Sequence, residues 1–264
     1  MSEQDPVSPR KDIPVLEAMN IGMLLDKAIH LYTRNFGLLI AIYSIPWAVT
    51  AAVGAIVRDD SLSPGLRFLR ILVSTVLNLV VSGIAGGAMS VVVSSRYLGT
   101  DISFRRAYGA ALRKAWTLAG CMLLSGLFII LGFLGLVVPG IFFVVFFFLL
   151  SPTIMLEDIR GARNLKRSRL LTKGYRWRTL FLILVSYLPI FVFVPIFIAI
   201  PKLGQTGRIS PLGTILLAVL SSSVSLFLGP FIAIVATLIY YNQRIRTEGF
   251  DLAFLAQAMS RRSE

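Results

Sequence analysis

Long apolar runs alternate with short charged segments along most of the chain. A helix that crosses about 30 Å of hydrocarbon needs roughly 20 apolar residues. Four runs have this length, and they cover residues 37–57, 71–95, 179–200 and 212–241. The pattern therefore predicts at least four membrane-spanning helices.

A fifth apolar run, over residues 115–156, is too long for one span. It carries no charged residue, and as a single helix it would be roughly 63 Å long at 1.5 Å per residue. Pro139 and Gly140 lie inside it, and this pair favours a helix break and a tight turn. We therefore expect two spans, 116–138 and 141–156, which brings the predicted total to six.

The basic residues fall mostly on one side of this arrangement. Six spans place 21 of the 26 Lys and Arg residues on the side of both termini and five on the other, whereas five spans divide them 11 to 15. Basic loops tend to remain in the cytoplasm. The distribution favours a multi-pass protein of the cytoplasmic (inner) membrane, with both termini cytoplasmic.

The chain divides into three parts. The first 16 residues are polar and contain no secretory signal, so we expect residues 1–20 to form a disordered cytoplasmic tail. Residues 21–241 form the six-span membrane domain. Residues 242–264 hold a cytoplasmic C-terminal motif and a short helix.

Three segments ahead of apolar runs resemble one another. Residues 24–40, 103–119 and 164–183 each set a charged, partly amphipathic stretch before an apolar run, although the third has a poor apolar stripe. Such stretches are typical of helices that lie along the membrane surface, but any cytoplasmic loop ahead of a span can look this way. The predicted fold class is an all-α integral membrane protein, with six transmembrane helices as three hairpins, each preceded by a cytoplasmic interfacial amphipathic helix.

Composition agrees with a membrane protein. Hydrophobic residues make up 56% of the chain and charged residues 15%, against roughly 25% charged in a soluble domain. The net charge of +13 would suggest nucleic acid in a soluble protein. Here the charge lies in short segments tied to the bilayer, so we expect anionic lipid as partner and no nucleic acid. No charged residue lies within a predicted span, which argues against an ion-coupled carrier.

Few residues suit catalysis or metal binding. The chain has one cysteine, Cys121, and one histidine, His30, so it cannot form an internal disulfide, a cysteine metal cluster or a motif with two histidines. It contains no G-x-S-x-G and no Walker A motif. We predict no catalytic residue, no metal site and no cofactor. Carboxylates near cytoplasmic span ends could hold a metal, but pairing with nearby arginines is favoured; they are Glu157, Asp158, Glu248 and Asp251.

The densest charge lies in residues 160–178, RGARNLKRSRLLTKGYRWR, with eight basic residues and no acid. A basic cluster beside a membrane attracts anionic head groups, and Tyr175 and Trp177 suit the interface. Alternatively, the loop only sets the topology. The candidate residues for contact with a lipid head group, or with a membrane or cytoplasmic protein partner, are Arg163, Lys166, Arg167, Arg169, Lys173, Arg176 and Arg178.

A second dense set of functional groups ends the last apolar run, in TLIYYNQRIRTEGFDLAF (residues 237–254). The favoured interpretation is a helix that leaves the bilayer and turns. Its tyrosines settle at the interface, its arginines stay inside, its glycine stops the helix and its aspartate caps a short amphipathic helix. The alternative is a ligand or docking motif, in which an acidic residue meets arginines of the basic loop. The residues concerned are Tyr240, Tyr241, Arg244, Arg246, Glu248, Gly249 and Asp251.

This stretch resembles the closing motif of a prokaryotic family named after the membrane domain of glycerophosphoryl diester phosphodiesterases. Members often end in Tyr-x-x-x-Arg-x-Arg-x-Glu-Gly-x-Asp, and the PGI turn at 139–141 and RSRLLTKGYRWR at 167–178 are also similar. The resemblance covers about Gly22 to Ala256. It implies a six-helix domain of the cytoplasmic membrane, here without the soluble phosphodiesterase domain. Phosphodiesterase activity is not expected, because one histidine cannot supply the histidine pair of that domain.

The sequence thus predicts a non-enzymatic scaffold or accessory factor, whose basic cytoplasmic face contacts anionic lipid or a protein partner. One alternative is a transporter or channel for a lipid or small amphipathic solute, with the Ser221–Ser225 run and proline-kinked helices lining the path. A weaker alternative is a lipid-modifying enzyme that uses Glu157, Asp158 and Glu248.

Overall fold

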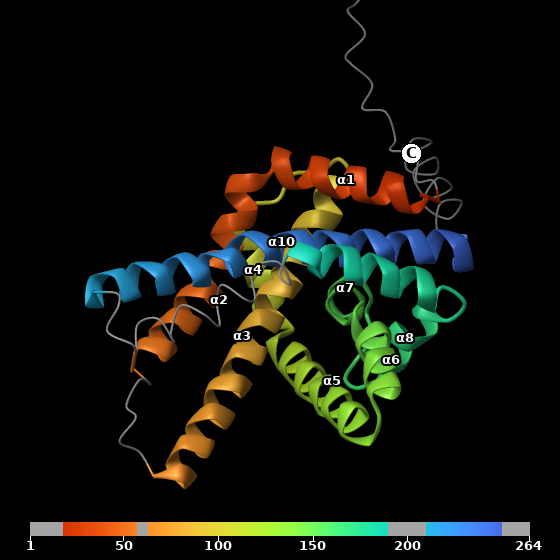
Figure 1. Cartoon of the computed structure of the whole chain (residues 1–264). Helices are drawn as coiled ribbons and strands as arrows, with labels where there is room; N and C mark the ends of the chain where they lie inside the picture. Colours follow the sequence, from red (N-terminus) through yellow and green to blue (C-terminus); the bar gives the residue numbers. More distant parts are fainter. Residues whose placement is uncertain (1–17, 57–62, 190–209, 250–264) are drawn as a thin grey trace, which may run out of the picture.

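The computed structural model describes residues 18–56, 63–189 and 210–249 (Figure 1). Within these ranges the chain is helical and contains no strand, which confirms the all-α prediction. Residues 176–189 form one of the helical stretches. The labelled helices are α1 (Ile21–Arg34), α2 (Phe36–Ile56), α3 (Pro64–Tyr97), α4 (Phe104–Arg113), α5 (Ala115–Gly135), α6 (Val137–Phe147), α7 (Leu150–Leu156), α8 (Arg163–Thr172) and α10 (Pro211–Glu248).

Four stretches of the described residues are long and apolar enough to cross a membrane, which indicates a membrane-embedded protein. The predicted span 37–57 corresponds to α2, whose described apolar part, Phe36–Thr50, is shorter. The predicted span 179–200 is helical as far as residue 189, and its remainder lies outside the described residues. The four long stretches are Pro64–Tyr97, Ala115–Gly135, Val137–Leu156 and Leu226–Glu248.

Exposed apolar side chains gather on the parts of α3, α5 and α6 that project away from the other helices in Figure 1. Phe68 on α3 is 70% exposed and Leu134 on α5 is 77% exposed. An apolar surface of this kind is stable when lipid tails cover it. These helices therefore have the surface that a membrane-embedded segment requires.

Glycines on α3 bring two other helices close to its backbone. A Cβ atom on Gly83 would lie 2.9 Å from Cγ of Met122 in α5. On Gly87 it would lie 2.9 Å from Cδ1 of Leu118 and 3.3 Å from Sδ of Met155 in α7. Small residues permit this kind of packing between membrane helices. As a result, α3 forms a shared wall for α5 and α7.

The break inside residues 115–156 lies at Leu136, and not at Pro139 as predicted. α5 ends at Gly135 and α6 starts at Val137, with Leu136 in an extended conformation between them. Pro139 falls in the first turn of α6, where its missing N–H costs no helical hydrogen bond. Gly132 and Gly140 face each other across the two helices, because a Cβ on Gly132 would lie 2.9 Å from the Gly140 Cα. Gly140 therefore allows α5 and α6 to pack closely, and the turn between these two helices comes earlier, at Leu136.

The predicted span 141–156 is divided between α6 and α7, with a short turn at residues 148–149. Pro152, in the first turn of α7, cannot donate a hydrogen bond to the carbonyl of Phe148, and this accounts for the break. The hydroxyl of Ser168 in α8 donates to the carbonyl of Phe146 at 2.6 Å and satisfies the end of α6. The break therefore coincides with the place where α8 packs.

Helices α1, α4 and α8 are amphipathic, but their inner faces pack against this chain and are not open to lipid. α1 packs on α10, α4 on α3, and α8 on α6 and α7. Leu24, Ala28 and Leu31 are buried on α1. On α8 the buried face combines leucines with polar side chains, which explains the poor apolar stripe of the third segment. The buried residues of α8 are Asn164, Leu165, Ser168, Leu171 and Thr172.

α10 lies at the centre of this packing. It contacts α1, α2, α3, α7 and α8. In Figure 1, α1 lies above α10, and α3 and α8 lie below it. Its residues Ile234, Leu238 and Tyr240 are completely buried. The last turns of α10 are therefore placed where several segments that are distant in the sequence meet.

Candidate functional site

Arg167 of α8 binds two carboxylates from distant parts of the sequence. Its Nε donates to Glu157 Oε2 at 2.7 Å and its Nη2 donates to Glu157 Oε1 at 3.0 Å. On the other side, Nη1 lies 2.5 Å from Glu248 Oε1 and Nη2 donates to Glu248 Oε2 at 2.9 Å. The planar guanidinium thus forms a fork with each carboxylate, the strongest geometry for such a pair.

Two further side chains of α10 complete this cluster. The hydroxyl of Tyr240 donates to Glu157 Oε1 at 3.0 Å. Arg244 donates from Nη1 to the Tyr240 hydroxyl and from Nε to Glu248 Oε2, both at 3.1 Å. Two positive and two negative charges balance within the set. We call Glu157, Arg167, Tyr240, Arg244 and Glu248 the arginine clasp.

Burial and charge strengthen the clasp. The side chains of Glu157 and Arg167 are only 11% and 23% exposed. The hydrogen bond that Arg167 donates to Glu248, followed by the one that it donates to Glu157, raises the pKa of Arg167 despite the opposing effect of burial. The hydrogen bond from Arg167, followed by that from Arg244, lowers the pKa of Glu248, which lies beyond the apolar part of α10. The stability that Glu248 adds is therefore present above its ordinary pKa and is lost as the pH falls through the lowered value.

The C-terminal motif is therefore mostly a packing element. Glu248 meets Arg167 of the basic loop, so the docking alternative holds for these two residues. The i,i+4 pair of Arg244 and Glu248 is present at 3.1 Å. Gly249 has φ of +58° and its N–H donates to the Ile245 carbonyl, so it ends α10 as predicted. Asp251 and its predicted helix lie outside the described residues.

The two tyrosines of the motif do not sit at the lipid interface. Tyr240 is completely buried and Tyr241 is 4% exposed. The hydroxyls of Tyr241 and Ser94 lie 2.5 Å apart. Both rings are covered by helices of this chain, because α10 ends inside a shell of other segments. The sequence signal of paired tyrosines after an apolar run is the same in either environment.

Arg246 and Arg178 fix the beginning of the described chain. The Met19 N–H donates to Asn242 Oδ1 at 2.9 Å, and Arg246 Nη2 donates to the Met19 carbonyl at 3.0 Å. Arg178 also donates to that carbonyl. Burial, together with repulsion from Arg246, lowers the pKa of Arg178. Arg178 and Arg246, both predicted site residues, thus bind the backbone carbonyl of Met19. Asn242, which binds the Met19 N–H, was not predicted from the sequence.

The predicted head-group residues divide into two sets. Arg167, Arg176 and Arg178 are partly buried, and the guanidinium of Arg176 stacks 4.9 Å from the Phe146 ring centroid. The other four residues are exposed on α8 and just after it: Arg163, Lys166, Arg169 and Lys173. We call these four the α8 row. Trp177, which is 76% exposed, follows Lys173, the last residue of this row, by four positions.

The carboxylates considered for catalysis are bonded to cations. Glu157 and Glu248 converge on Arg167, which occupies the position between them that a metal would need. Asp158 is fully exposed and lies 3.8 Å from Lys114 Nζ. Among the described residues, no group of three acidic, histidine or cysteine side chains is placed to hold a metal ion. The arrangement favours a structural role for Glu157 and Glu248.

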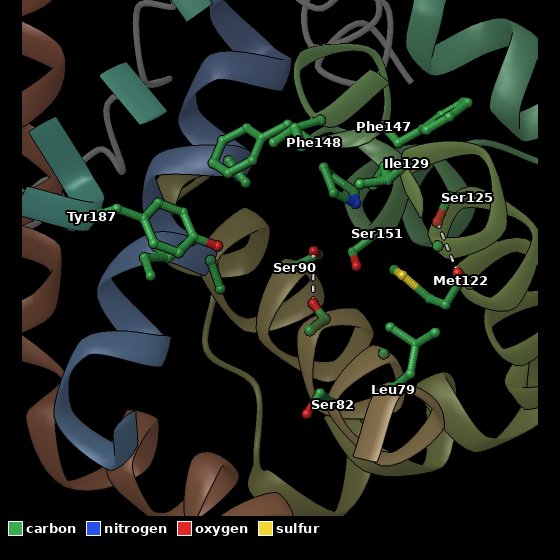
Figure 2. Close-up of a pocket in the computed structure, with 18 of the residues that line it drawn as sticks. Leu79, Ser82, Ser90, Met122, Ser125, Ile129, Phe147, Phe148, Ser151 and Tyr187 are labelled. Carbon is green, nitrogen blue, oxygen red and sulfur yellow. Dashed lines mark hydrogen bonds between the residues drawn. The ribbon is translucent and has the colours of Figure 1, made fainter. Parts of the chain in front are cut away.

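A cavity of about 300 Å³ lies among the helices α2, α3, α5, α6, α7 and α10. Its wall is mostly apolar, with Ser82, Ser90, Ser125 and Ser151 as polar groups. Figure 2 shows the hydroxyl of Tyr187 pointing toward Ser90 and Ser151. Ser90 and Ser125 donate to backbone carbonyls of their own helices at 2.8 and 2.9 Å. Their oxygens therefore remain available as acceptors.

The path expected along residues 221–225 lies mostly outside the described side chains. Only Ser223 in that run has a described side chain, and it is not among the lining residues. The α3 serines were missed because isolated serines in an apolar run are common in membrane helices. Their separation by eight residues on α3, close to two turns, was the one available signal.

Comparison of the chain with protein-family models, with curated proteins and with solved structures gives no match.

The arginine clasp predicts a loss of stability in Arg167→Met. Removing Arg167 leaves the partly buried Glu157 without its ion-pair partner and leaves Glu248 with Arg244 alone. We therefore expect the Tm in detergent to fall by roughly 5–10 °C. Cys121, the single cysteine and 3% exposed, permits this measurement with a thiol-reactive fluorophore. Lys166→Met is the matched control, because Lys166 neighbours Arg167 and is exposed. Glu248→Gln, alone and combined with Arg167→Met, should give a coupling energy of about 1–3 kcal/mol. Equal Tm values for Arg167→Met and Lys166→Met contradict the clasp.

Proposed function

We propose that the chain is a non-enzymatic, multi-pass protein of the cytoplasmic membrane that binds anionic lipid through the α8 row. In this proposal it has six spans with both termini cytoplasmic, and it is a stand-alone member of the family named after the phosphodiesterase membrane domain. It acts as a scaffold or accessory factor at the inner surface. The distribution of basic residues and the apolar helices support this topology.

The placement of α8 carries the proposal. One side of α8 is buried against the protein and is held there by the arginine clasp. The side chains of the α8 row are exposed on the remaining surface. Each Lys or Arg near an anionic membrane surface contributes about 1 kcal/mol. A fixed row of four such side chains can therefore bind lipid head groups without a large cost in helix ordering.

Neutralising three of the four residues of the α8 row tests this function. We expect Arg163→Gln, Lys166→Gln and Arg169→Gln combined to weaken binding of phosphatidylglycerol by tenfold or more, since about three favourable charges are lost. The measurement is native mass spectrometry of the purified full chain, titrated with phosphatidylglycerol or phosphatidylcholine. A control variant, Arg163→Lys with Arg169→Lys, keeps the charge and should keep the binding. Unchanged phosphatidylglycerol binding in the neutral variant refutes the proposed role.

The cavity among the helices favours a second candidate, the passage or storage of a lipid or small amphipathic solute. A volume of about 300 Å³ lies at the lower end of the range of ligand pockets, about 300–1,000 Å³. An apolar wall with few hydroxyl groups suits an amphipathic molecule. The hydroxyl acceptors of Ser90 and Ser125 would bind its polar end.

Lipid scrambling in proteoliposomes tests the second candidate. The full chain should scramble a fluorescent phosphatidylcholine faster than protein-free vesicles, and Ser82→Phe should abolish the difference, because Ser82 lines the cavity and is only half-buried. Leu127→Phe adds bulk on the exposed surface of α5 and should have no effect. The Cys121 unfolding signal verifies that both variants fold. A wild-type rate equal to that of protein-free vesicles excludes the passage of lipid by this chain.

A further inference from the structure

A second basic feature lies away from α8 and from the arginine clasp. It is a cavity of about 310 Å³ between α1 and the turn that follows α3. Four basic or histidine side chains contribute to its wall. The lining residues are Lys27, His30, Leu31, Arg34, Asn35, Arg96, Gly99, Thr100 and Asp101. We call this cavity the α1 basin.

α1 presents three of these side chains on one face. Lys27, His30 and Arg34 are separated by three and four residues, the spacing of neighbours on a helical surface. They are exposed, whereas Leu24 and Ala28 are completely buried beneath the helix. The buried leucine and alanine fix the rotation of α1, so its three polar side chains remain directed to the basin.

Arg96 and its turn form the opposite wall. Arg96 lies in the last turn of α3 and pairs with Asp101 through Nη1. Its Nε is buried and has no hydrogen-bond partner among the described residues. Gly99 has φ of +75°, which allows the chain to turn back so that Thr100 and Asp101 reach the basin. The ammonium of Lys27 lies 5.9 Å from the Tyr97 ring centroid, which holds it near this wall.

The charges of the basin are unequal. Lys27, Arg34 and Arg96 bring three positive charges, and Asp101 brings one negative charge. His30 adds a hydrogen-bond donor. Within the described chain, no acidic side chain forms an ion pair with Lys27, His30 or Arg34. The excess of about two positive charges matches a phosphate monoester, which carries about −1.5 to −2 at pH 7.

We propose that the α1 basin is a binding site for one phosphate monoester group. Arg34 and Arg96 supply the fork-like donors that suit phosphate oxygens, and Lys27 supplies a point charge. The phosphate belongs either to the head group of a lipid or to a soluble compound. The lipid source rests on the proposed function, because it requires that α1 lie at the cytoplasmic surface of the bilayer. The soluble source does not.

Ligand titration of the purified full chain in phosphatidylcholine nanodiscs tests the basin. The probes are dioctanoyl phosphatidic acid, inorganic phosphate, and dioctanoyl phosphatidylglycerol as a phosphodiester. We expect Lys27→Gln with Arg34→Gln to raise the Kd of phosphatidic acid, the phosphate monoester among these probes, by tenfold or more. The matched control, Arg106→Gln with Arg113→Gln, removes two exposed charges from α4 that do not line the basin, and it should change this Kd by less than about twofold. The Cys121 unfolding signal verifies that both variants fold.

Each outcome decides the proposal. Tight binding of phosphatidic acid alone supports a lipid head group, and tight binding of inorganic phosphate as well supports a soluble source. Equal weakening by the two double variants overturns the basin, since it would mean that only overall charge matters. Absence of phosphate monoester binding to the wild-type chain also overturns it. Failure of the proposed function has a different signature, namely unchanged phosphatidylglycerol binding in the α8 variant.

Discussion

The two ion pairs of Arg167, with Glu157 and with Glu248, are the interaction on which the packing of α8 against the end of α10 depends. They join the loop after α7, the middle of α8 and the last turn of α10, and the residues of the longer pair are 81 positions apart in the sequence. Partly buried charges are expensive without partners. Because each member of the clasp satisfies another, the clasp stabilises the packing of these three segments against one another.

This constraint separates the basic residues into two kinds. Cations directed inward, such as Arg167 and Arg178, bind carboxylates or backbone carbonyls of the chain itself. Cations directed outward lie on α8 and α1, where the opposite side of each helix is buried. The outward cations are therefore held on fixed surfaces, and these surfaces are the ones for which we propose anionic ligands.

The sequence predicts the helical class and the long apolar helices well, because the thickness of a bilayer demands runs that composition alone reveals. It places the turn near Pro139 wrongly, since proline is tolerated in the first turn of a helix and the break falls at Leu136. It also cannot tell Arg167 from the seven other basic residues of its loop. Which arginine pairs with Glu157 and Glu248 depends on which face of α8 is buried. That face contains the polar residues Asn164 and Ser168, so the pattern of apolar residues does not predict it.

Hydrogen–deuterium exchange across α8 in nanodiscs tests most directly whether the clasp holds this helix in place. In the wild-type chain the amides of Arg163–Thr172 should be protected. In Arg167→Met their exchange should accelerate by tenfold or more, while that of α5 stays unchanged and Lys166→Met behaves as wild type. Equal protection of α8 in Arg167→Met and the wild-type chain would contradict the account.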